Sequence, residues 1–123
     1  MTWLMVAAGG AAGAVARYGV SVAVARAAGS PVPLATALVN ILGCAAAGVL
    51  LGAMAAGRLS LTVDQRALVF AGVLGGFTTF SGVGIDTLAL VQDGRGATAV
   101  TNVALQIGVG LAALAIAYTL VRR

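Results

Sequence analysis

Four long apolar stretches separated by short polar turns follow one another from end to end of the chain. They cover about residues 3–25, 34–56, 67–90 and 97–121. Each is long enough to cross a bilayer, because about 20 apolar residues in a helix match the thickness of the hydrocarbon core. The pattern predicts an all-α membrane protein, a single domain of four transmembrane helices over residues 1–123, with both termini on the same side.

The third stretch is interrupted at its centre by GGFTTFSG, residues 75–82. Glycine, threonine and serine are poor helix formers, and unpaired backbone groups are costly at this depth in a membrane. Irregular backbone persists there only where it is buried in protein, lines an aqueous path or binds an ion. The pattern favours a helix broken at mid-membrane, in which we expect Gly75 to adopt a backbone conformation that valine resists. The alternative is a continuous helix whose small residues allow close packing.

Composition supports a membrane location and argues against an enzyme. Of 123 residues, 61% are hydrophobic and 8% are charged, which is outside the usual range of soluble domains. The chain has no histidine, a single cysteine (Cys44) and only three carboxylates, so it lacks the residues for a disulfide framework or a Cys/His metal site. The isoelectric point near 10.7 reflects arginines at helix ends, where lipid headgroups lie, and no basic cluster suggests nucleic acid.

Arginines in the turns give a modest orientation signal. Four lie on the side that holds the termini: Arg58, Arg66, Arg122 and Arg123. Two lie on the opposite side: Arg26 and Arg95. Because cytoplasmic loops carry an excess of basic residues, this distribution favours cytoplasmic termini, although the excess is small enough to leave the inverse orientation open.

Glycines recur four residues apart in three of the predicted helices. The pairs are Gly9 and Gly13, Gly48 and Gly52, and Gly72 and Gly76. Such spacing removes side chains from one stripe of a helix and allows two backbones to approach closely. It predicts a compact bundle or an oligomer. Since so small a bundle has little interior, a transport function would require a dimer.

Several polar residues lie within the predicted spans. Arg17 continues the Gly9 and Gly13 stripe, so its guanidinium should face protein. A charged side chain at this depth suggests a functional site. The alternative is that the Arg17 side chain extends to the far membrane interface. Asn40 offers two amide donors, which suit an anion or an interhelical hydrogen bond. The fourth helix carries a polar stripe, Asn102 and Gln106. Asp86 is expected to cap the broken helix or to pair with an arginine from a neighbour.

Aromatic spacing in the third stretch is compatible with anion contact. Phe77, Phe80 and Val83 lie three residues apart. Rings at this spacing usually serve packing, but a ring edge carries positive quadrupole density and can face an anion. With neighbouring hydroxyls and amides, such edges could replace the water around a small anion.

Three segments together resemble the signature blocks of the Fluc/CrcB fluoride channels. They are GGAAGAVARY at 9–18, TALVNILG at 36–43 and GGFTTFS at 75–81. The blocks occur in the order found in that family, and the length and four-span layout match over the whole chain.

The resemblance implies a fluoride-selective passive channel that exports cytoplasmic fluoride through the cell membrane of a prokaryote and so lowers its toxicity. It implies an antiparallel, dual-topology dimer with two pores. It also implies a structural sodium ion at the dimer interface, held by the backbone carbonyls of Gly75 and Thr78. The residues that it assigns to the fluoride pathway are Arg17, Asn40, Thr79, Phe80 and Ser81.

The chain departs from the family pattern in its pore lining. The position of a usual second phenylalanine holds Val83, a usual glutamate is Asp86, and the fourth helix has Gln106 and Gly110 where hydroxyls are common. These changes leave the sodium motif intact. They favour a chain that works in a heterodimer with a related chain carrying both phenylalanines, and the alternative is a homodimer.

A small multidrug exporter is the competing transporter class, because it also has four short spans and dual topology. Such exporters require a glutamate within the first helix. Residues 3–25 contain no carboxylate, so the sequence argues against this class.

Overall fold

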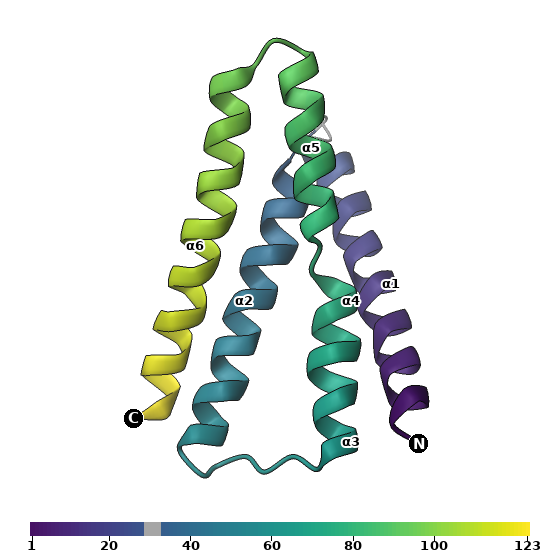
Figure 1. Ribbon diagram of the computed structural model, residues 1–123, viewed down its shortest axis with the longest axis vertical. Helices are drawn as coiled ribbons and strands as arrows, with labels where there is room; N and C mark the ends of the chain where they lie inside the picture. Colours follow the sequence, from purple (N-terminus) through teal and green to yellow (C-terminus); the bar gives the residue numbers. More distant parts are fainter. Residues whose placement is uncertain (29–32) are drawn as a thin grey trace.

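The computed structural model describes residues 1–28 and 33–123 of the chain, and these are almost entirely helical (Figure 1). The elements are α1 (Thr2–Ala28), α2 (Leu34–Ala55), α3 (Val63–Arg66), the π-helix η1 (Ala67–Leu74), α4 (Gly75–Phe77), α5 (Phe80–Gln92) and α6 (Gly96–Arg122). Half of the first predicted turn, residues 26–33, falls on residues 29–32, outside the described part. The segments α3, η1 and α4 form one continuous rod, which α5 extends beyond a break (Figure 1).

The helices begin and end within a few residues of the predicted spans. Among the described residues, three are long and apolar enough to cross a membrane: Leu34–Ala55, Val63–Gln92 and Gly96–Arg122. The first predicted span corresponds to α1, which has 27 residues, carries Arg17 and Arg26 and is not one of these three.

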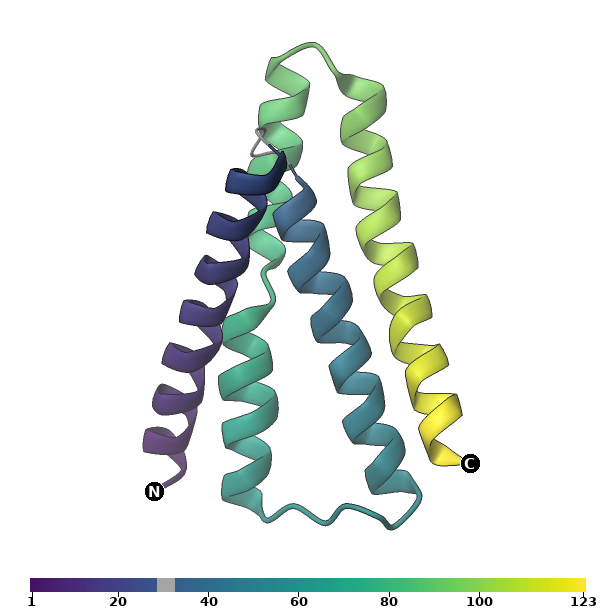
Figure 2. The same cartoon turned by 180° about the vertical axis from the view of Figure 1, so that it is seen from behind.

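The helices pack as two pairs that meet at one end of the molecule. α6 runs along α2, α1 runs along η1 and α4, and α5 crosses to contact α6 (Figures 1 and 2). Both termini and the connection between α2 and α3 lie at one end, and the turn between α5 and α6 lies at the other (Figure 1). The termini therefore share a side, as the four-helix pattern predicts.

Close glycine contacts hold α1 against the third segment. A Cβ atom added to Gly9 would lie 2.5 Å from the Leu68 carbonyl oxygen, and one added to Gly76 would lie 2.5 Å from that of Gly10. A Cβ atom on Gly52 would lie 2.7 Å from the Tyr118 carbonyl oxygen, where α2 meets α6. The glycine spacing thus correctly predicts backbones in close approach.

The third segment is broken, as predicted, but the glycines do not form the break. Thr78 (φ −80°, ψ 160°) and Thr79 (φ −152°, ψ 115°) are extended, whereas Gly75 is helical (φ −63°, ψ −37°). Threonine is β-branched and adopts extended backbone readily. The expectation that Gly75 needs a glycine-type conformation is therefore wrong.

Candidate functional site

Asn40 on α2 holds the break by binding the backbone of Thr79. The Thr79 N–H donates to Asn40 Oδ1 at 2.8 Å, and Asn40 Nδ2 donates to the Thr79 carbonyl oxygen at 3.1 Å. In a continuous helix the Thr79 N–H would donate to the Gly75 carbonyl four residues earlier. The Asn40 amide therefore replaces a helical partner and keeps the extended backbone satisfied.

At the break, the carbonyl groups of residues 75–78 lose their helical partners, and that of Gly76 accepts from Arg17 Nε instead. The Gly75 carbonyl loses the Thr79 N–H to Asn40. The Thr78 carbonyl loses the N–H of Gly82, which donates to Thr79 Oγ1 at 2.9 Å and so caps α5. Among the described residues, no side chain and no loop backbone group donates to either carbonyl. Unpaired carbonyls at mid-membrane depth are the kind of ligand that binds a cation such as sodium.

Arg17 on α1 reaches the other side of the break. Its Nε donates to the Gly76 carbonyl oxygen at 3.1 Å, in the last turn of α4. The Ser21 hydroxyl, one turn along α1, donates to the Arg17 carbonyl at 3.1 Å. The guanidinium is thus directed at protein, as the glycine stripe predicts, and its charge lies beside the break.

A chain of side-chain amides runs from Asn40 into α6. Asn40 Nδ2 donates to Gln106 Oε1 at 2.8 Å, and Gln106 Nε2 donates to Asn102 Oδ1 at 2.8 Å. Asn102 Nδ2 in turn donates to the Thr87 hydroxyl of α5 at 3.1 Å. The sequence predicts the polar stripe of α6 from its helical spacing. It gave no sign that this stripe continues through Asn40 to the break, because 66 residues separate Asn40 from Gln106.

Two cavities flank the break. The first, of about 230 Å³, is lined by Asn40, Cys44, Thr78, Thr79, Phe80, Val83, Gln106 and Ile107. The second, of about 190 Å³, is lined by Arg17, Ser21, Thr36, Val39, Thr79, Ser81, Gly82 and Ile85. Thr79 belongs to both walls. The five residues that the sequence assigns to a pathway therefore all line one cavity or the other, although their roles there stay a prediction.

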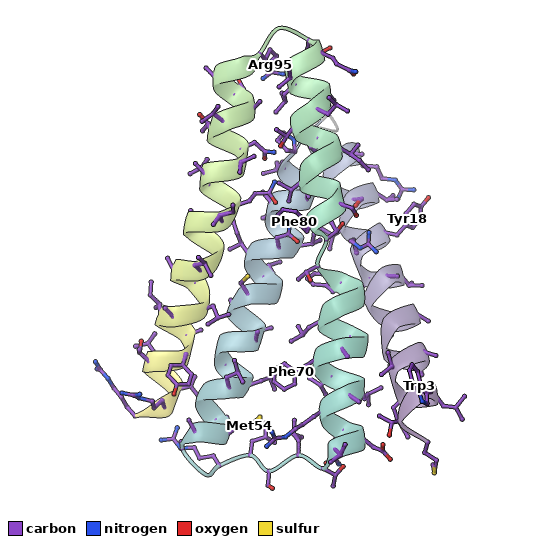
Figure 3. All side chains as sticks on the ribbon, viewed as in Figure 1. Trp3, Tyr18, Met54, Phe70, Phe80 and Arg95 are labelled. Carbon is purple, nitrogen blue, oxygen red and sulfur yellow. The ribbon has the colours of Figure 1, made fainter. Side chains whose placement is uncertain are left out.

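Phe80 and Val83 both line the first cavity, but one side chain is exposed and the other is buried. The Phe80 side chain, at the start of α5, is 83% exposed and lies beside the break (Figure 3). Val83 is 6% exposed, packed inside the chain. On α6, a Cβ atom at Gly110 would lie 3.4 Å from the Cys44 sulfur, so the missing side chain leaves room for that thiol.

Asp86 does not take the role expected for it. The N-cap of α5 is Thr79, and Asp86 lies two turns further into the helix. Its Oδ2 is buried without a hydrogen-bond partner among the described residues. The prediction of a helix cap is therefore wrong, and the pair with an arginine from a neighbour is not formed among the described residues of this chain. The carboxylate instead borders a third cavity, of about 380 Å³, together with Ser21 and Thr36.

Comparison with known proteins identifies a family. Residues 4–118 match the family described as CrcB-like protein, Camphor Resistance (CrcB). A protein of Rhodospirillum rubrum named "Fluoride-specific ion channel FluC" is 41% identical over 112 residues, which cover 87% of this chain and 84% of the relative. Proteins of the same name from Methylobacillus flagellatus and Aeromonas salmonicida are 39% and 37% identical, over 97% and 98% of this chain and 93% and 95% of their own lengths.

The match therefore extends over nearly the whole chain and includes every element that forms the break and its two cavities. The chain belongs to the CrcB-like family.

Proposed function

We propose that this chain forms a fluoride-selective passive channel that lets fluoride leave the cytoplasm. The observation that carries the proposal is the clamped break, where Asn40 holds Thr79 between two cavities lined by all five expected pathway residues. Relatives covering most of the chain bear the name fluoride-specific ion channel, which supports the same function.

The chemistry of the two cavities suits a small, strongly hydrated anion. Hydroxyl groups of Thr79 and Ser81, which lie 3.1 Å apart, can replace part of the water around the ion. The edge of the Phe80 ring offers positive quadrupole density. Arg17 supplies a fixed positive field at the second cavity, which favours entry of an anion over a cation.

The pore is completed by a second subunit in an antiparallel, dual-topology dimer. The exposed Phe80 ring beside an incomplete cavity supports this arrangement, since an aromatic residue at the pore needs a facing wall. Buried apolar side chains among the described residues are few: Ala35, Val39, Val83, Leu90 and Ala99. In this dimer all four helical columns cross the membrane, α1 included, with lipid around them.

A structural sodium ion at the dimer interface fits the break. The carbonyl oxygens of Gly75 and Thr78 have lost their helical hydrogen bonds, so a cation would satisfy them. Two antiparallel subunits would present four such oxygens around one central point. These residues would hold the ion through backbone atoms alone, so its role is assembly and not conduction.

A second candidate function is that of one subunit in a heterodimeric fluoride channel. Val83 favours it, because the buried valine leaves each pore of a homodimer with one aromatic edge fewer than usual. In that case fluoride transport would require co-expression with a related chain that carries both phenylalanines.

Growth of a fluoride-sensitive bacterial strain without its own fluoride exporter tests the proposed function. Expression of this chain should restore growth in fluoride-containing medium and should not change growth in the same concentration of chloride. Rescue only on co-expression with a related chain would support the heterodimer. Absence of rescue in either case, with the protein present in the membrane, would contradict a fluoride channel.

A further inference from the structure

Gln106 is a buried amide at the wall of the first cavity. It lies on α6 with 6% of its surface exposed, and it borders the cavity together with Asn40 and Val83. Its Oε1 accepts a hydrogen bond from Asn40 on α2, and its Nε2 donates one to Asn102 on α6. Gln106 is therefore held in a single orientation beside the space that an ion would occupy.

The amide of Asn40 has no hydrogen left to offer an anion. A side-chain amide has two N–H donors. One hydrogen of Asn40 Nδ2 goes to the Thr79 carbonyl and the other to Gln106 Oε1. Its Oδ1 is occupied by the Thr79 N–H. Asn40 thus serves as a clamp on the break, and the donor that faces the ion has to come from another residue.

The backbone of Thr79 fixes the direction of the whole amide chain. Nitrogen and oxygen of a side-chain amide are assigned from their partners. Because a backbone N–H can only donate, the atom that faces it must be Asn40 Oδ1. It follows that Gln106 turns its oxygen to Asn40 and its nitrogen to Asn102. Only one hydrogen of Gln106 Nε2 is used in this way among the described residues.

We propose that Gln106 is a specificity-determining residue of the pore, whose second Nε2 hydrogen donates to fluoride in the first cavity. The inference rests on the proposed fluoride channel function. Fluoride is the halide that accepts hydrogen bonds most strongly, so a buried and fixed N–H favours it over chloride. Gln106 supplies this donor in the cavity where Val83 offers no aromatic edge.

Substitutions at two positions of the same chain separate an ion ligand from a structural link. Gln106→Met keeps the length of the side chain and removes its donors. Asn102→Leu breaks the next bond of the chain but lies outside the wall of the first cavity. Gln106→Glu is the variant that best keeps the fold, but it also adds a negative charge at the cavity, so Gln106→Met is the variant that isolates the loss of the donor. The introduced carboxylate still accepts from Asn40, and Asn102 can turn its amide over because the Thr87 hydroxyl can donate as well as accept.

Fluoride and chloride efflux from liposomes reconstituted with each variant tests the inference. Gln106→Met and Gln106→Glu should lower the rate of fluoride efflux at least about tenfold, as expected for one hydrogen bond to an ion. Both variants should also lower the ratio of the fluoride efflux rate to the chloride efflux rate. Asn102→Leu should lower thermal stability with fluoride efflux within about threefold of wild type.

Three outcomes have distinct meanings. Wild-type fluoride efflux in either folded Gln106 variant would overturn the inference. So would an equal loss in Asn102→Leu, because Gln106 would then act only as a link in the amide chain. A wild-type protein that carries no fluoride, either alone or together with a related chain, would refute the proposed function instead.

Discussion

Asn40 shows how one side chain can stabilise a break in a membrane helix. An interrupted helix at mid-membrane exposes backbone groups that no water can satisfy. The Asn40 amide matches the N–H and C=O of a single residue, Thr79, with one acceptor and one donor. The remaining hydrogen connects the break to α6 through Gln106. One residue therefore couples the three helices that form the first cavity.

Asn40→Asp tests two things together: the hydrogen bonds of Asn40 to the break, and the need for a non-negative electrostatic potential where the anion enters. The carboxylate cannot donate to Thr79 or Gln106, and its charge would repel an entering anion. We expect fluoride efflux to fall by about a hundredfold or more, since a like charge about 4 Å away is unfavourable by several kcal/mol. Gln92→Glu makes the same chemical change at an exposed position at the end of α5 and serves as the control. If Asn40→Asp conducted at the wild-type rate, Asn40 would be neither clamp nor pore residue.

At the scale of helices, the glycine stripe decides how closely α1 approaches the third segment. Gly13 is buried against the backbone of Val73 and Phe77, whereas a Cβ atom on Gly10 would meet nothing within 4 Å. Gly13→Ala should therefore destabilise the protein by about 1–3 kcal/mol, the usual cost of overpacking. Gly10→Ala on the same helix should be neutral or slightly stabilising, because alanine is the better helix former. Thermal unfolding in detergent measures both variants, and equal effects would contradict this packing.

The sequence predicts the helices and the glycine contacts because both follow from local spacing. The helix bounds follow apolar length, and Gly9, Gly13, Gly72 and Gly76 follow the four-residue period. The break lies within the predicted segment, but its position depends on a residue far away, since Asn40 lies 39 residues from Thr79. No pattern along the chain indicates that pairing. The π-helix of Ala67–Leu74 was likewise not predicted, because its apolar composition is also typical of an ordinary helix.

The sequence predicted which residues belong to the candidate site but not the hydrogen bonds that connect them. The five pathway residues came from the motif resemblance, and the structure gathers them around two cavities. The use of both Asn40 hydrogens, and the donor left on Gln106, depend on the packing of α6 against α2. The expectation that Asp86 caps α5 was wrong because the cap is Thr79, and the position of Thr79 depends on the break.

For the molecule as a whole, sodium should control assembly. Replacing sodium by N-methyl-D-glucamine should lower the thermal stability of the purified dimer and favour dissociation, by about 2.7 kcal/mol when sodium is at 100 times its dissociation constant. Because the proposed ligands are backbone carbonyls, Thr78→Ser should keep this sodium dependence. Size-exclusion chromatography and thermal unfolding provide the readout. If the dimer were equally stable in sodium and in N-methyl-D-glucamine, the proposal of a sodium ion bound by Gly75 and Thr78 would be contradicted.

Fluoride efflux from liposomes that contain this chain alone is the most direct test of a fluoride channel. Potassium and valinomycin would carry the compensating charge, and ion-selective electrodes would record fluoride and chloride separately. We predict rapid fluoride efflux that does not depend on a pH gradient, with chloride retained. Fluoride efflux no faster than from protein-free liposomes, or chloride efflux at a comparable rate, would contradict the proposal that this chain forms a fluoride-selective channel.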